Sequence, residues 1–591
     1  MLSSDESLAQ AVERHQAGDL AQAEAAYRAI LTRDPRCSDA LHLLGVIASQ
    51  RGDDATAEGL IRQAIALKPD AARYHFDLGI SLKSLGRLQD AVAALQQGLQ
   101  MEPQAAEANN NLGCVYLDLG QHRKAVQCFV SATGLRPDYP EALNNLGNAY
   151  ASLDRPGDAI GAYVRALQAR PDYAAAATNL GRVLRRQGRL AEAEECFRRA
   201  LELEPGDADA HHNLGLALKG KGDASGALAS YREALRLRPR SAAILNSLGV
   251  VLAEQGQITD ALGCYEAALR EQPQLREAQW NQALARLLSG NLAGGWPGYE
   301  QRLHMQRYYP HRYRKPRWDG GELQGQRVLI HDEIGYGDVF QFVRYLPLVK
   351  ARGAYVIFEC KPGLQRLLAG MEGVDCLRER TSQPVPEAEF DLYLPMESLP
   401  YVFGTTLATV PDTVPYVRPD PALVDEWRKR LDGLLGNGDG IRVGLVWSGN
   451  PDSEYDRQRS ISLDRLAPLA SVGGVRLVSL QKGPAADQLR REPSGPDMLA
   501  LGDQLTDFAD TAAVIANLDL VISVETAVPH LAGAMARPVW TLLPFVPAWR
   551  WLLAREDSPW YPSMRLFRQP RSGDWDSVIA SVAQRLEQLV R

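Results

Sequence analysis

The sequence predicts an all-α array of helical repeats followed by an α/β region of two lobes. Two observations predict this order. Glycine recurs every 34 residues through the first half of the chain, and beyond residue 320 short runs of β-branched residues alternate with amphipathic helices. A chain of 591 residues also exceeds what one hydrophobic core supports, so we expect more than one folding unit.

The helical repeats are defined by small and bulky residues at fixed positions. The recurring glycines are Gly45, Gly79, Gly113, Gly147, Gly181, Gly215 and Gly249. In each unit an alanine follows, a bulky residue lies four positions after it, and a proline stops the second helix. Small residues let two antiparallel helices approach closely, and each unit buries its apolar face against its neighbours. The pattern is typical of tetratricopeptide repeats (TPRs), and it predicts a superhelix over residues 1–300 whose last unit is degenerate.

Asparagine recurs at one position of the first helix of the repeats. The residues are Asn111, Asn145, Asn179, Asn213 and Asn281. In this class of repeat the position lines the inner groove, where a row of amides can hold the backbone of a protein acceptor by paired hydrogen bonds. The alternative is that these amides are solvated or satisfy polar groups between repeats.

The second half of the chain reads as two parallel α/β lobes after a linker at residues 301–325. Strands are expected at 328–331, 355–359 and 391–395 in a first lobe, residues 326–420, and at 442–447, 476–480, 518–524 and 538–543 in a second lobe, residues 421–591. A last helix at about 575–590 closes the chain and is expected to pack across the lobes. Two Rossmann-like lobes are the arrangement of GT-B nucleotide-sugar transferases, in which ligands bind at the strand ends.

The first candidate site follows the first strand of the first lobe. Gly335 and Gly337 permit close approach of a ligand. Asp338 stands at the start of a helix expected at about 339–350, where the dipole favours an ionised carboxylate. Asp338 is therefore a candidate general base, with Glu333 as the competing one. The alternative is that Asp338 only caps its helix.

The second candidate site lies at strand ends of the second lobe. A helix is expected to begin near His530, after Glu525, Thr526 and Ala527. Backbone N–H groups at this helix start can bind phosphate oxygens, and His530 can add a hydrogen bond. The residues expected to face them are Trp447, Ser448, Gly449, Arg457, Arg459 and, more weakly, Gln481. The two arginines can neutralise the phosphate of a donor nucleotide, or alternatively pair with the acidic residues around them.

Composition narrows the classes of ligand and partner. The net charge of −7 gives no reason to expect nucleic acid. A basic stretch at 302–317 reads mainly as a solvated linker, with an anionic ligand as the alternative. Seven cysteines without a CxxC pair, and no apolar segment of membrane-spanning length, favour a cytoplasmic protein. No DxD motif stands at a strand end, so we expect neither a metal nor a cofactor besides the nucleotide sugar.

Four ordered motifs carry a family resemblance that covers essentially the whole chain. They are HDEIGYGDVFQFVRYLPLVKARGA, VGLVWSGNP with DRQRSISL, DFADTAAVIANLDLVISVETAVPHLAGA and LLPFVPAWRWLLAREDSPWYPSMRLFRQ. They resemble the bacterial heptosyltransferase-like (family 9-like) glycosyltransferases that are fused to tetratricopeptide repeats. The resemblance implies a metal-independent, inverting GT-B transferase in which Asp338 is the base and Thr526, Ala527 and His530 bind the donor phosphate.

Some proteins of this tandem architecture are flagellin glycosyltransferases that add nonulosonic acids. The resemblance therefore implies a protein O-glycosyltransferase acting on serine or threonine, with flagellin as acceptor and a CMP-sugar as donor. Two residues depart from the family pattern, since Glu525 stands where the family has aspartate and Pro529 where it has a small residue. The alternatives are a catalytically weak scaffold that binds a nucleotide or a partner, and a transferase acting on lipopolysaccharide or polysaccharide.

Overall fold

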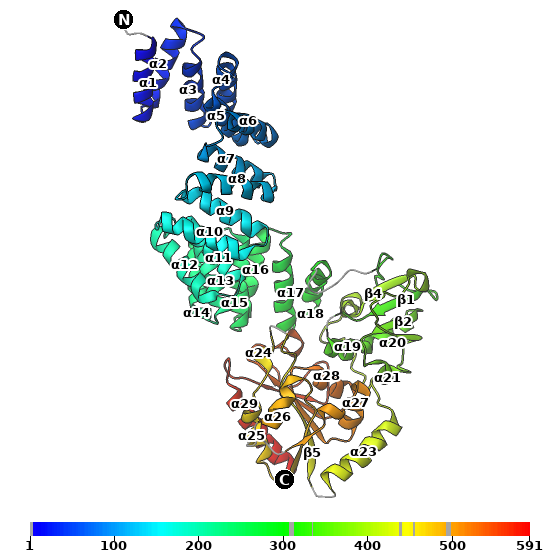
Figure 1. The fold of residues 1–591 in the computed structure, drawn as a ribbon. Coiled ribbons are helices and arrows are strands. Elements are labelled where there is room, and N and C mark those ends of the chain that lie inside the picture. Colours follow the sequence, from blue (N-terminus) through cyan, green and yellow to red (C-terminus); the bar gives the residue numbers. More distant parts are fainter. Residues whose placement is uncertain (1–3, 306–312, 334, 437–439, 453–454, 492–497) are drawn as a thin grey trace. The chain divides into compact units, whose positions relative to one another are not determined.

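The computed structural model describes residues 4–305, 313–333, 335–436, 440–452, 455–491 and 498–591. It consists of helical hairpins followed by an α/β region with two parallel sheets, which confirms the predicted fold class (Figure 1). Contacts divide the chain into two compact units, Met1–Pro239 and Arg240–Arg591. The unit boundary therefore lies inside the repeats, although the helical pattern itself continues to Tyr299.

The first unit contains only helices among its described residues, and consecutive helices pack as antiparallel pairs. The helices are α1 Ser4–Gln16, α2 Leu20–Arg33, α3 Ser38–Gln50, α4 Asp54–Leu67, α5 Ala72–Ser84, α6 Leu88–Met101, α7 Ala106–Asp118, α8 His122–Leu135, α9 Pro140–Ser152, α10 Pro156–Ala169, α11 Ala174–Arg186, α12 Leu190–Leu203, α13 Ala208–Gly220 and α14 Ala224–Leu237.

The recurring glycine of each repeat packs against the recurring bulky residue. A Cβ atom built on Gly147 would lie 2.5 Å from Cε1 of Tyr163, which is fully buried between the two helices. The same contact recurs at Gly45 with Ile61, Gly79 with Leu95, Gly113 with Phe129, Gly181 with Phe197, Gly215 with Tyr231 and Gly249 with Tyr265. The close approach of helices that the sequence pattern predicts is therefore present in every one of these hairpins.

Adding a methyl group at Gly147 is expected to destabilise the repeats. The Gly147→Ala variant should lose about 1–3 kcal/mol of unfolding free energy, because the Tyr163 ring is enclosed on all sides and must shift. The matched control is Gly161→Ala in α10, where nothing lies within 4 Å and alanine should stabilise the helix by about 0.5–1 kcal/mol. Urea denaturation followed by helical circular dichroism measures both, and shifts of the same sign would contradict the packing argument.

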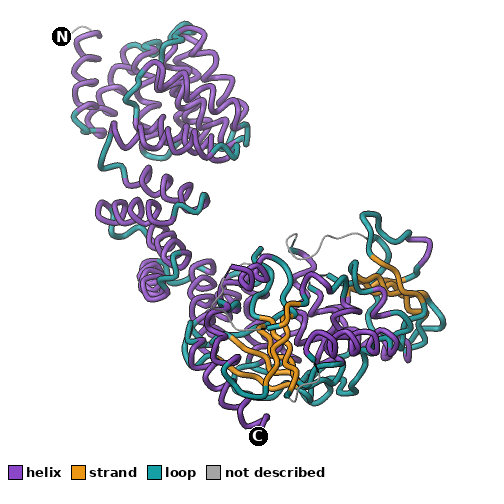
Figure 2. Tube along the Cα trace, turned by 60° about the horizontal axis from the view of Figure 1, so that its bottom comes forward, coloured by secondary structure: helices purple, strands orange, loops and turns teal. Residues whose placement is uncertain are grey.

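The second unit continues the repeats and then forms two separate parallel sheets (Figure 2). Its repeat helices are α15 Ala242–Glu254, α16 Ile258–Glu271, α17 Arg276–Leu288 and α18 Leu292–Tyr299, followed by the 3₁₀ helix η1 Glu300–His304. The first sheet has the order β3-β2-β1-β4, with β1 Arg327–His331, β2 Tyr355–Cys360, β3 Cys376–Glu379 and β4 Leu392–Pro395. The second has the order β10-β9-β8-β5-β6-β7, with β5 Ile441–Val446, β6 Val475–Ser479, β7 Leu499–Ala500, β8 Leu520–Val524, β9 Val539–Leu543 and β10 Met564–Arg568.

Short and long helices surround the two sheets. They are α19 Tyr336–Phe342, α20 Leu346–Ala351, α21 Gln365–Leu368, α22 Leu399–Val402, α23 Pro421–Leu435, α24 Asp456–Arg459, α25 Ala467–Ala470, α26 Gln488–Arg491, α27 Phe508–Ala516, α28 Ala527–Ala534 and α29 Trp575–Val590. The 3₁₀ helices η4 Met396–Ser398 and η8 Trp549–Trp551 follow β4 and β9. No helix in the described ranges is long and apolar enough to cross a membrane.

Each sheet has one point at which the strand order reverses. In the first sheet β1 lies between β2 and β4, and in the second β5 lies between β6 and β8. The crevices between the carboxyl ends of β1 and β4, and of β5 and β8, are the positions at which doubly wound sheets bind ligands. Both candidate sites predicted from the sequence begin at these strand ends.

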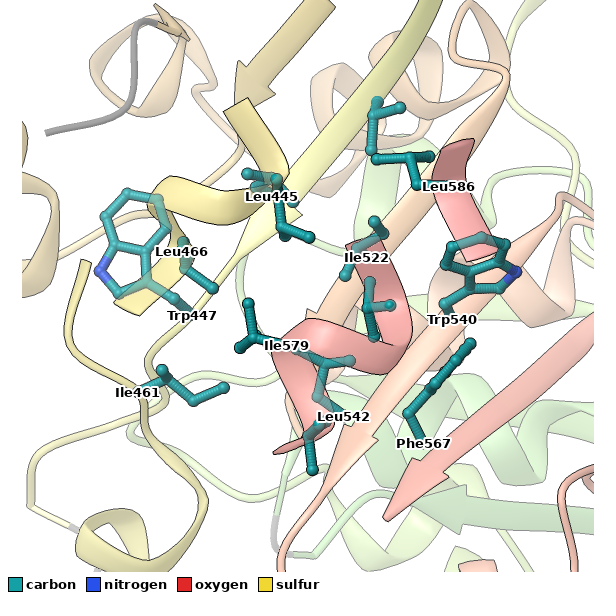
Figure 3. Close-up of a cluster of buried hydrophobic side chains, with 14 of the residues drawn as sticks. Leu445, Trp447, Ile461, Leu466, Ile522, Trp540, Leu542, Phe567, Ile579 and Leu586 are labelled. Atoms are coloured by element: carbon teal, nitrogen blue, oxygen red, sulfur yellow. The ribbon is translucent and has the colours of Figure 1, made fainter. Parts of the chain in front are cut away.

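Several elements differ from the expectation. The strands β3, β7 and β10 were not predicted, because CLRE and MRLFR carry polar residues and β7 has only two residues. The helix expected at 339–350 is interrupted after Phe342, where Pro347 follows and cannot donate a backbone hydrogen bond. α28 begins at Ala527 rather than near His530. α29 was expected to pack across the lobes, but its apolar face packs into the core of the second sheet (Figure 3).

Candidate functional site

The two predicted sites meet where α19 of the first lobe packs on α28 of the second. A Cβ atom built on Gly337 would lie 2.9 Å from Cδ2 of His530 and 3.6 Å from Cα of Ala527. Glycine is therefore needed at position 337 for the helices to approach this closely. The contact brings a strand-end loop of one lobe to the helix start of the other, as in an interlobe active site.

Asp338 uses both of its carboxylate oxygens. One accepts a hydrogen bond from the Gly335 N–H at 3.0 Å, which caps α19, and the other forms an ion pair with Arg550 of η8. The Nε of Arg550 also donates to Gln341 of α19 at 2.7 Å. Asp338 thus performs the capping role that the sequence offered as an alternative, and it also links the lobes. Nothing in the spacing of the motif indicated Arg550; its place between two tryptophans was the only signal.

Glu333 lies at the carboxyl end of β1 with a fully buried side chain. Its Oε2 accepts from Arg302 at 2.7 Å, and burial raises the pKa of Glu333 while the guanidinium opposes the rise. Arg302 is itself fully buried. The expectation that the basic stretch 302–317 is solvated is therefore wrong at Arg302, because three carboxylates surround it; residues 306–312 of that stretch lie outside the described residues.

His530 is a neutral, buried imidazole. Burial lowers the pKa of His530 to about 3, and the positive charge of Arg344 acts in the same direction. Its Nδ1 lies 2.9 Å from the hydroxyl of Tyr561, and its ring packs on Trp551 at a centroid distance of 4.8 Å. When Tyr561 donates this bond the imidazole proton is on Nε2. His530 can therefore donate a hydrogen bond to a phosphate but supplies no positive charge.

The loop after β5 is fixed by Gln481. The Oε1 of Gln481 accepts from the backbone N–H groups of Trp447 and Ser448, both at 3.0 Å, and its Nε2 donates to the Ser448 carbonyl at 3.1 Å. Gln481 thus positions the loop in this conformation. Trp447 was predicted to bind the donor, but its side chain is fully buried in the core of the second lobe and packs there (Figure 3).

The two arginines of the loop differ in their surroundings. Arg459 is half-buried, donates to Asp456 at 3.3 Å and packs over Gly449, where a Cβ atom would lie 2.6 Å from its Nη2. Arg457 is exposed. The predicted alternative, pairing with a neighbouring acid, thus holds for Arg459. The positive charge of Arg459 opposes the rise in the pKa of Glu525. Arg459 therefore lies near the switch point of the second sheet.

Glu525 and Thr526 connect β8 to α28. Thr526 caps the helix by accepting from the Val528 N–H at 3.4 Å. Pro529 lies in the first turn of α28, where a backbone N–H has no partner within the helix, so the proline does not disturb it. Glu525 is buried and accepts from the Ala548 N–H at 3.0 Å. Arg568, at the end of the unpredicted strand β10, faces Glu525 and was missed for that reason.

Glu525 is expected to make stability depend on pH. Burial raises the pKa of Glu525 to about 7, so the folded protein keeps its proton where the unfolded chain has lost it. Ionising the buried carboxyl lowers the free energy of unfolding. This loss is absent below the ordinary pKa of glutamate and reaches its full size above about pH 7. Glu525→Gln should thus raise the unfolding free energy by about 2–3 kcal/mol at about pH 8 and leave it unchanged at about pH 4, as measured by urea denaturation. Equal effects at the two pH values would contradict this assignment.

The repeat asparagines form hydrogen bonds within the array. Asn145 donates to Asn110 at 3.1 Å, Asn179 to Asn144 at 3.0 Å, and Asn281 to Asn246 at 3.0 Å, each reaching the preceding repeat. Asn213 instead donates to the Asp209 carbonyl of its own helix at 2.8 Å, and Asn111 is half-buried. The alternative offered for these residues, polar contacts between repeats, thus holds for Asn145, Asn179 and Asn281. Contact with an acceptor stays a prediction.

Comparison with known proteins identifies the first half of the chain. Family models described as tetratricopeptide repeat match residues 138–204 and residues 8–72, 76–117, 178–242, 212–274 and 247–303, and a model described as TPR repeat matches 113–154. Protein FlbA of Caulobacter vibrioides is 30% identical over 336 residues, which cover 52% of this chain and 54% of FlbA. The chain therefore spans about half the length of this curated relative.

Solved structures similar to parts of the chain include those of MamA and YrrB. MamA is 27% identical, covers 29% of this chain and 94% of its own, and has a TM-score of 0.27. YrrB, described as a TPR protein with an unusual peptide-binding site, is 26% identical, covers 30% of this chain and 92% of its own, and has a TM-score of 0.28. The family matches and the glycine packing agree that residues 8–303 contain tetratricopeptide repeats.

Proposed function

We propose that this protein transfers a sugar from an activated nucleotide sugar to a serine or threonine hydroxyl of a protein bound by its repeats. The observation that carries the proposal is the contact of α19 with α28, in which Gly337 and Asp338 of the first lobe meet His530 and Arg550 of the second. A candidate base and a helix start that can bind phosphate are thereby adjacent. Repeats that hold protein segments supply the acceptor.

The donor phosphate is proposed to bind at the start of α28. Thr526 and Ala527 supply the backbone N–H groups for this site, since the Val528 N–H donates to Thr526 and Pro529 has none, and the helix dipole favours an anion there. Arg459 adds positive charge from the loop after β5, and neutral His530 adds a hydrogen bond. Together these groups stabilise the negative charge that develops on the leaving phosphate.

Transfer is proposed to proceed by a single displacement. The acceptor oxygen attacks the anomeric carbon, the bond from that carbon to the phosphate oxygen breaks, and Asp338 takes the hydroxyl proton. Attack on the face opposite the leaving phosphate inverts the anomeric configuration. Since Asp338 is paired with Arg550, one of its oxygens must exchange this partner for the acceptor hydroxyl. Glu333, at the end of β1, is the competing base.

The proposed identity of the acceptor and the donor rests on the sequence motifs. Their resemblance to flagellin glycosyltransferases supports flagellin as the acceptor and a nonulosonic acid, carried as a CMP-sugar, as the donor.

One observation favours a second candidate function, a scaffold that binds a nucleotide without turnover. Both oxygens of Asp338 are already engaged, by Gly335 and by Arg550.

A donor screen separates the two functions. The purified chain is incubated with CMP-sugars and nucleoside diphosphate sugars, with and without flagellin, and both nucleotide binding and nucleotide release are measured. A transferase binds one donor class and releases its nucleotide faster when acceptor is present. Binding without release at any acceptor concentration would assign the scaffold function instead, and release that depends on lipopolysaccharide would move the acceptor to that class.

A further inference from the structure

The last repeat packs directly on both lobes of the α/β region. The indole N–H of Trp296, in α18, donates to the Thr405 carbonyl of the first lobe at 2.7 Å. The same indole meets the ring of Trp549, in η8 of the second lobe, edge to face at a centroid distance of 5.3 Å. Trp296 is fully buried. The last hairpin is therefore part of the α/β core rather than a spacer before it.

Tyr299, the last residue of α18, lies at the centre of this contact. Its ring stacks on Trp280 at 5.0 Å and meets Trp549 edge to face at 5.9 Å, and its hydroxyl donates to Glu397 Oε2 at 3.4 Å. Arg550, whose guanidinium lies over the Trp549 ring at 4.8 Å, is the residue that pairs with Asp338. A continuous row of contacts thus runs from the last repeat to the candidate base.

Arg302 enters the first lobe at the switch point of its sheet. Its Nη2 lies 2.7 Å from Glu333, at the end of β1, and donates to the Ser398 hydroxyl, after β4, at 2.7 Å. Its Nη1 lies 2.6 Å from Glu300, and its Nε lies 3.6 Å from Glu397. One buried guanidinium therefore balances three carboxylates, and its removal would leave buried negative charges without a counter-ion.

Two buried polar atoms beside this cluster have no hydrogen-bond partner among the described residues. They are Oε1 of Glu333 and Nε2 of Gln341. Each belongs to a side chain whose other polar atom is held by an arginine, Glu333 by Arg302 and Gln341 by Arg550. Buried polar groups are normally paired, so each of these side chains keeps one polar atom unsatisfied while an arginine holds the other.

We propose that Tyr299 and Arg302 are positioning residues of the transfer centre, supplied to it by the end of the last repeat and by the 3₁₀ helix η1 that follows it. Arg302 holds Glu333 and Glu397 in place between β1 and β4. Tyr299 holds Glu397 through its hydroxyl, and through its ring it holds Trp549 and with it Arg550 and Asp338. The inference rests on the proposed transferase function. It adds that the transfer centre is complete only when the last repeat packs on the two lobes.

The test compares Arg302→Gln with Arg317→Gln, a control that removes an exposed arginine lying 3.9 Å from Glu300. Thermal unfolding, donor binding, and the kcat, KM and pH profile of transfer are measured for each variant. Arg302→Gln should lower kcat by about 100-fold or more with donor Kd changed less than about threefold. The acid limb of its pH profile should move to higher pH, because loss of the cation raises the pKa of Glu333, around which Glu300, Glu397 and Tyr299 remain.

Rescue distinguishes positioning from general loss of structure. The double variant Arg302→Gln with Glu397→Gln removes one cation and one anion, and should recover part of the lost kcat. If Arg302→Gln does not fold, Tyr299→Phe keeps the ring contacts and loses only the hydroxyl that donates to Glu397, and should lower kcat about 3- to 10-fold with donor Kd unchanged. An active wild type with Arg302→Gln or Tyr299→Phe indistinguishable from Arg317→Gln overturns this inference alone. A wild type that transfers no sugar overturns the proposed function and this inference together.

Discussion

Replacing Asp338 by asparagine is expected to lower the rate of sugar transfer by about 10²- to 10⁴-fold, the usual contribution of a general base. Asparagine has the same size and can still accept the capping hydrogen bond from the Gly335 N–H. It cannot take a proton from the acceptor hydroxyl. Donor affinity should change little, because the groups proposed to bind phosphate belong to α28 and the loop after β5.

The matched control for this variant is Asp375→Asn. Asp375 likewise pairs with a cation, Lys350 at 2.7 Å, and accepts a backbone hydrogen bond from Val356 at 2.8 Å, but it lies away from α19 and α28. It should keep full activity. Steady-state kinetics and calorimetric donor titration measure both variants. Retained transfer in Asp338→Asn, together with loss in Glu333→Gln, would move the role of base to Glu333.

The second large effect is expected at the contact between the lobes. Gly337→Ala places a methyl group 2.9 Å from the His530 ring, which is enclosed by Trp551 and Tyr561 and cannot yield. α19 must therefore move away from α28, and a displacement of about 1 Å in a catalytic centre costs on the order of 100-fold in rate. We expect transfer to fall by about 10- to 100-fold.

Gly433→Ala is the control for this second variant. Gly433 lies within α23, and nothing is found within 4 Å of a Cβ atom built there. The variant should keep its activity and gain slightly in stability. The transfer rates of Gly337→Ala and Gly433→Ala, measured at saturating donor, test whether the α19–α28 contact serves catalysis. Equal rates would show that the α19–α28 contact does not serve catalysis.

The repeats and the positions of the strand-end loops could be predicted from the sequence. Both have local causes, since the spacing of Gly147 and Tyr163 is set by one hairpin, and a buried strand followed by Glu525 and Thr526 reads directly as a loop at a sheet edge. The prediction that Trp447 binds the donor is nevertheless wrong. Its motif position marked the loop, but its large apolar ring belongs to the core.

The residues that join distant segments could not be predicted. Arg302 and Arg550 find their carboxylate partners 31 and 212 residues along the chain, and no periodicity relates such positions. Composition was misleading at Arg302, because a basic stretch normally lies in solvent, whereas this guanidinium is buried by the carboxylates around it. Only the packing of the last repeat on the two lobes reveals its role.

Transfer of a sugar to a protein hydroxyl would increase the intact mass of the acceptor. Flagellin is incubated with the purified chain and each CMP- or nucleoside diphosphate-activated sugar in the presence of EDTA, and the product is analysed by mass spectrometry and site mapping. We expect an increment of one sugar residue, located on serine or threonine and absent with Asp338→Asn. No increment with any donor, together with unchanged flagellin glycosylation in a deletion strain, would contradict it.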